Sequence, residues 1–126
     1  MISEDDLIAA IFSVEQNIRD FEISKEHDKH DIALLKKWSD KIAEDKVKLQ
    51  VLYCARGITR MMSGDEIEKN VLEVKKRLSN LHSPREMDLF DKRKPQDKKA
   101  YLHQEMVNKM MLYALEFVEG KQKRIL

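Results

Sequence analysis

Glycine, proline and cysteine are scarce in this chain of 126 residues, which contains three Gly, two Pro and one Cys. A protein made of many β-strands needs Gly and Pro in its turns, so their scarcity argues against that class. A single cysteine, Cys54, cannot form an intrachain disulfide, which fits a reducing compartment. No uninterrupted apolar run reaches the roughly 18 residues of a membrane span. The acidic residues 4–6 stand where a signal peptide would be basic, so we expect a cytoplasmic protein without a membrane partner.

An excess of charge of one sign is also absent, because 24 Lys and Arg face 23 Asp and Glu. No global field therefore attracts nucleic acid or anionic lipid, and binding to either would need a local patch. Charge of both signs is abundant, at 37% of residues, beside 42% hydrophobic residues. This charged fraction is typical of helices with one solvated face, and the apolar fraction is enough for one core. We expect residues 1–126 to form a single all-α domain.

Apolar residues recur at steps of three and four, the spacing of one helix face. Such stripes cover residues 7–21, 32–61, 67–81 and 106–118, and a short helix is expected at 87–90. Ser3, Ser63 and Ser83 each precede an acidic residue by three positions, which is the pattern of a capping box. The predicted fold is a mostly antiparallel bundle of four to five helices with a long second helix. Whether that helix is continuous from 31 to 62 stays open, because residues 44–46 are charged and Gly57 lies inside it.

Two charged connectors are expected, near residues 24–31 and 91–99. The first contains no apolar side chain, and we expect a turn in which Asp28 or Asp31 caps the next helix. It also holds His27 and His30 beside these aspartates, but we interpret the group as a solvated turn and expect no metal or cofactor. The second is interrupted by Pro95, with the last helix beginning close behind it.

The last helix is apolar almost all the way round, since only Glu116 is charged between Met110 and Val118. Such a helix lies in the middle of a fold or packs on another subunit. Flexible thioethers suit surfaces that fit an irregular partner, although core filling is the simpler role for methionine. The candidate partner-binding residues are Met106, Met110, Met111, Tyr113 and Phe117. Gly120 is placed to end the helix, followed by Lys121, Lys123 and Arg124 where cations complement the helix dipole.

Basic residues crowd the second connector and form a candidate anion-binding patch: Lys92, Arg93, Lys94, Lys98 and Lys99. A nucleic-acid-binding regulator would use such a patch on a phosphate backbone. Two aspartates interrupt the patch, and no aromatic residue lies within 92–99 for base stacking. A solvated charged linker is the competing interpretation.

Arg77 and His82 are separated by four residues, in the order Arg-x4-His. This spacing resembles that of the HEPN ribonucleases, which are also small all-α domains. The resemblance implies RNA cleavage by arginine and histidine side chains of paired subunits. The polar residue usual after the arginine is Leu78 here. The structural alternative makes Arg77 a solvated residue and His82 the C-terminal residue of its helix.

No motif nominates a catalytic residue, and Cys54 lies on the inner stripe of its helix, where cysteine is normally core. The leading hypothesis is therefore a non-enzymatic protein–protein interaction module: a small cytoplasmic adaptor, chaperone or regulator that acts through helix faces. Its expected partners are another protein and further copies of the chain. The alternatives are the nucleic-acid-binding regulator and the HEPN-like ribonuclease.

Overall fold

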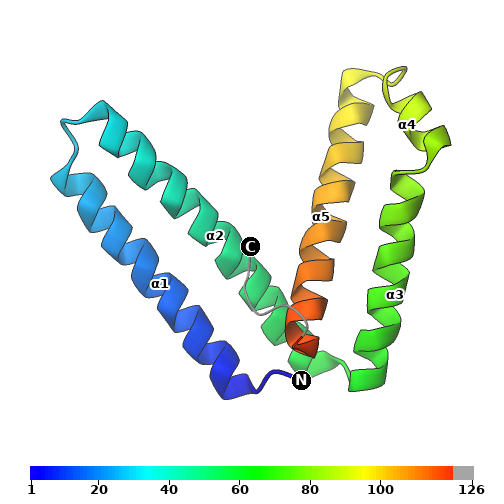
Figure 1. Ribbon diagram of the computed structural model, residues 1–126, viewed down its shortest axis with the longest axis horizontal. Coiled ribbons are helices and arrows are strands. Elements are labelled where there is room, and N and C mark those ends of the chain that lie inside the picture. The colour runs from blue at the N-terminus through cyan, green and yellow to red at the C-terminus, as the bar shows by residue number, and fades with distance from the viewer. Residues whose placement is uncertain (121–126) are drawn as a thin grey trace.

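The computed structural model describes residues 1–120, which contain five helices and no strand (Figure 1). The helices are α1 (Glu4–His27), α2 (Ile32–Met61), α3 (Gly64–Leu81), α4 (Pro84–Phe90) and α5 (Pro95–Glu119). The predicted all-α bundle with a long second helix is confirmed, because α2 runs unbroken for 30 residues. Neither the charged residues 44–46 nor Gly57 interrupts it. Lys121, Lys123 and Arg124 lie outside the described residues.

Side-chain caps begin four of the helices. The hydroxyl of Ser3 accepts a hydrogen bond from the Asp6 amide at 3.1 Å. The hydroxyls of Ser63 and Ser83 likewise accept from the amide three residues further on, which belongs to a glutamate in both cases. At the start of α2 the Asp31 carboxylate accepts from the amides of Ala33 and Leu34. These bonds satisfy amides that have no partner inside their own helix. The caps expected from the sequence are therefore confirmed, and Asp31 rather than Asp28 caps α2.

Both connectors are shorter than the sequence suggested. Helix α1 continues through Ser24 to His27, which leaves residues 28–31 as the first turn. A helix whose sides all face water can consist of polar residues. The polar residues 24–27 therefore continue α1 although none of them is apolar. Helix α5 begins at Pro95 itself, which leaves residues 91–94 as the second connector. Proline suits the first turn of a helix because its missing N–H would have no helical partner there.

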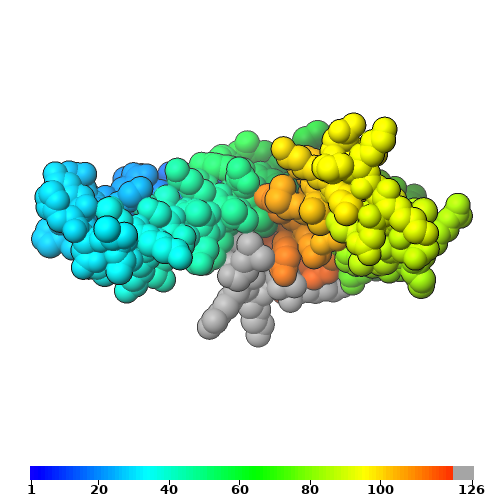
Figure 2. Space-filling model, turned by 90° about the horizontal axis from the view of Figure 1, so that it is seen from above, coloured from blue at the N-terminus to red at the C-terminus, as the bar shows by residue number. Residues whose placement is uncertain are grey.

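The helices form two hairpins that diverge like the arms of a V (Figure 1). One arm pairs α1 with α2, and the other pairs α3 with α5, with α4 at its tip. The start of α1, the end of α2, the start of α3 and the end of α5 all meet at the base. Seen from above, the tips lie at opposite ends of the molecule (Figure 2). The contact between the arms runs through α2 and α5.

One continuous core fills the base, built from the converging helix ends. Its fully covered side chains include Leu7, Leu52, Ile67 and Leu115, one from each of α1, α2, α3 and α5. The chain start is fixed there as well, because the Ile2 amide donates to the Val118 carbonyl at 2.9 Å. The end of α5 packs against both α2 and α3, so it occupies the middle of the fold.

Each tip has a small aromatic cluster of its own. In the first arm the rings of Phe21 and Trp38 stack with their centres 5.8 Å apart. In the second the rings of Phe90 and Tyr101 lie 5.1 Å apart. These contacts join residues of the same arm, so packing at the tips stabilises each hairpin separately.

Candidate functional site

The cleft between α2 and α5 lies where the two arms begin to separate. It has a volume of about 310 Å³, and its lining is mostly apolar. Helix α2 contributes Val51, and α5 contributes Leu102, Glu105, Met106, Lys109, Met110 and Tyr113. We call this the α2–α5 cleft. Its apolar α5 residues follow one another at steps of three and four, so they form a single stripe along that helix.

The stripe is uncovered over most of its length. Leu102 is 53% exposed and Met106 is 51% exposed, while Met110 is half-buried closer to the base. Tyr113 lies lower still and retains 36% exposure. Burial of side chains this large gains about 1.5–3 kcal/mol each, so leaving several of them in water forgoes stabilisation that a covering surface would recover. The cleft is therefore an open apolar groove rather than a closed core.

The structure brings together three of the five candidate partner-binding residues. Met106, Met110 and Tyr113 line the cleft. Met111 lies on another face of α5, with its sulfur 4.0 Å from the Cys54 sulfur, and Phe117 is buried in the core at the base. Sequence reasoning missed Leu102 and Val51. Leu102 continues the stripe one turn before Met106, so extending the spacing backwards along the helix would have found it.

Charged groups on the rim of the cleft are paired. The Glu105 carboxylate accepts from the Lys109 ammonium at 3.0 Å and contacts the His82 ring nitrogen at 3.0 Å. These two contacts, with His82 the larger influence, hold the pKa of Glu105 below its ordinary value. The rim thus carries both signs of charge close together and has no strong preference for a cation or an anion.

The surroundings of Cys54 disfavour the thiolate form that a nucleophile needs. It is half-buried on the α5-facing side of α2, next to Met111. Burial raises the pKa of its thiol, so the group stays protonated at neutral pH. Its packing against the core agrees with a structural role for this side chain.

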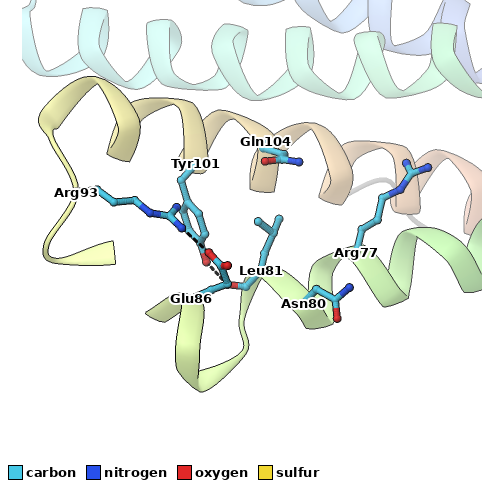
Figure 3. A pocket seen from close by; sticks show the side chains of 7 residues that line it. All are labelled: Arg77, Asn80, Leu81, Glu86, Arg93, Tyr101 and Gln104. Atoms are coloured by element: carbon cyan, nitrogen blue, oxygen red, sulfur yellow. Dashed lines mark hydrogen bonds and ion pairs between the residues drawn. The ribbon is translucent and has the colours of Figure 1, made fainter. Parts of the chain in front are cut away.

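A second cavity, of about 370 Å³, lies between α3, α4 and α5 (Figure 3). It is lined by Arg77, Asn80, Leu81, Glu86, Arg93, Tyr101 and Gln104. Arg93 donates to the Glu86 carboxylate, and its guanidinium lies 5.1 Å from the centre of the Tyr101 ring. The Tyr101 hydroxyl donates to the Leu81 carbonyl. These contacts join α4 and the second connector to α3 and α5, so they stabilise the packing of these helices at the tip of the second arm.

The candidate anion-binding residues surround that same corner. Arg93 pairs with Glu86, as described above, and Lys92 pairs with Asp88 at 3.9 Å. The Lys98 ammonium lies 5.4 Å from the centre of the Phe90 ring. Lys94 and Lys99 are exposed. Two of the five cations, Lys92 and Arg93, therefore pair with a carboxylate of their own arm, which reduces the net charge offered to a phosphate backbone.

Arg77 and His82 bind different carboxylates. The Arg77 guanidinium donates to Glu73 at 2.8 Å, one turn earlier on α3. His82 follows the last residue of α3 and contacts Glu105 of α5. Figure 3 shows Arg77 at the end of the second cavity away from Arg93. His82 is not among the residues that line that cavity.

The histidine-containing turn at the tip of the first arm is held by its own hydrogen bonds. The Asp28 carboxylate contacts the His27 ring nitrogen at 2.9 Å and accepts from the Trp38 indole at 2.8 Å. These bonds lower the pKa of Asp28, with the His27 contact the larger cause. Within residues 1–120, no three histidine, cysteine or acidic side chains gather closely enough to hold a metal ion.

Comparisons with protein-family models, with curated proteins and with solved structures found no match to this chain. Across residues 1–120, every helix is too short or too polar to span a lipid bilayer. We therefore infer function from the geometry of the α2–α5 cleft.

Proposed function

We propose that this protein is a non-enzymatic protein–protein interaction module, a small cytoplasmic adaptor, chaperone or regulator. The observation that carries the proposal is the stripe on α5 made of the exposed residues Leu102, Met106 and Tyr113 and the half-buried Met110, which faces Val51 of α2 across the cleft. An apolar groove between two helices accepts the apolar face of a third helix. The partner contributes that helix.

The chemistry of the stripe fits such a partner. Methionine side chains are unbranched and polarizable, so Met106 and Met110 can adjust to the side chains of a docked helix. The Tyr113 ring supplies a rigid contact with a polar end, a combination that is enriched at protein interfaces. The paired Glu105 and Lys109 lie on the rim, where exposed charges contribute to orientation more than to affinity.

Photo-crosslinking from the cleft tests the proposal. A photoreactive phenylalanine analogue replaces Tyr113 in the cleft or, as a matched aromatic control, Phe12, which is 64% exposed on α1. After irradiation in the native host, we expect severalfold more protein adduct from position 113 than from position 12. Adding Met106→Lys to the position 113 variant should reduce the yield, because it places a charge in the apolar groove. Equal yields from both positions would refute the proposal, provided that circular dichroism shows both variants folded.

A further inference from the structure

We draw no further inference here: the strongest candidate, the apolar stripe of α5 that lines the α2–α5 cleft, belongs to the site already described, and nothing in the structure shows which molecule covers it.

Discussion

Glu105 connects two structural elements at the rim of the α2–α5 cleft. Its carboxylate contacts His82, which follows α3, and Lys109, which is one turn further along α5. The pKa of Glu105 is lowered in the folded protein. A carboxyl group of this kind stabilises the fold at pH values above its unfolded pKa, and the stabilisation is lost as pH falls through the folded pKa.

We therefore predict that Glu105→Gln destabilises the protein at pH 7 by less than about 1 kcal/mol, because the contacts are partly exposed to water. The difference from the wild type should shrink as pH falls through the folded pKa, and it should vanish once the carboxyl group is protonated in both the folded and the unfolded protein. Urea unfolding at a series of pH values measures it. Glu68→Gln, on the exposed face of α3, is the control. A destabilisation by Glu105→Gln that is the same at both ends of the pH range would contradict this account.

At the scale of the helices, two glycines have opposite roles. Gly57 lies inside α2, and a β-carbon added there would meet nothing within 4 Å. Gly120 ends α5 in the left-handed conformation with φ 82°, and its amide donates to the carbonyls of Glu116 and Phe117. Both sites have open space around them. A substitution at either position thus changes backbone energetics without a steric clash.

We predict that Gly57→Ala stabilises the protein by up to about 1 kcal/mol, because alanine is the better helix former. Gly120→Ala should destabilise it by about 1 kcal/mol, because an L residue is strained at positive φ. Thermal or urea unfolding of the two variants side by side measures both effects. A Gly57→Ala variant less stable than the wild type would show that α2 needs flexibility at this point.

The helices could largely be predicted from the sequence because their signals are local. Ser3, Ser63 and Ser83 mark helix starts through a hydroxyl and an amide three residues apart. The connectors were predicted too long for the same reason. Residues 24–27 carry neither an apolar stripe nor a stop signal, and a solvated helix simply continues through them. Pro95 was taken as a break, although it suits the first turn of α5.

The candidate site could be predicted only in part, because spacing does not reveal where two helices separate. Met106, Met110, Tyr113 and Phe117 follow one another on α5 at steps of four, three and four. Phe117 is covered in the core where α5 meets α2 and α3, whereas Met106 lines the α2–α5 cleft and is half exposed. The same periodicity therefore describes a buried core residue and a half-exposed residue.

At the scale of the whole molecule, the V shape leaves one apolar face of α5 partly uncovered. The two arms share a core at the base and have separate aromatic clusters at their tips. An arrangement of this kind leaves the inner face of α5 without a covering helix above Met110. Self-association, which we expect from the sequence, is one way to complete the packing that the single chain leaves open.

The mass of the protein in solution tests this account most directly. Light scattering after size-exclusion chromatography should give about twice the chain mass of 14.9 kDa for the wild type. Met106→Lys places a charge in the apolar α2–α5 cleft and should return the protein to the mass of one chain. Leu72→Lys, on the exposed face of α3, should remain at twice the chain mass. A wild type that stays at 14.9 kDa at high concentration, or a Met106→Lys variant that remains paired, would contradict the account.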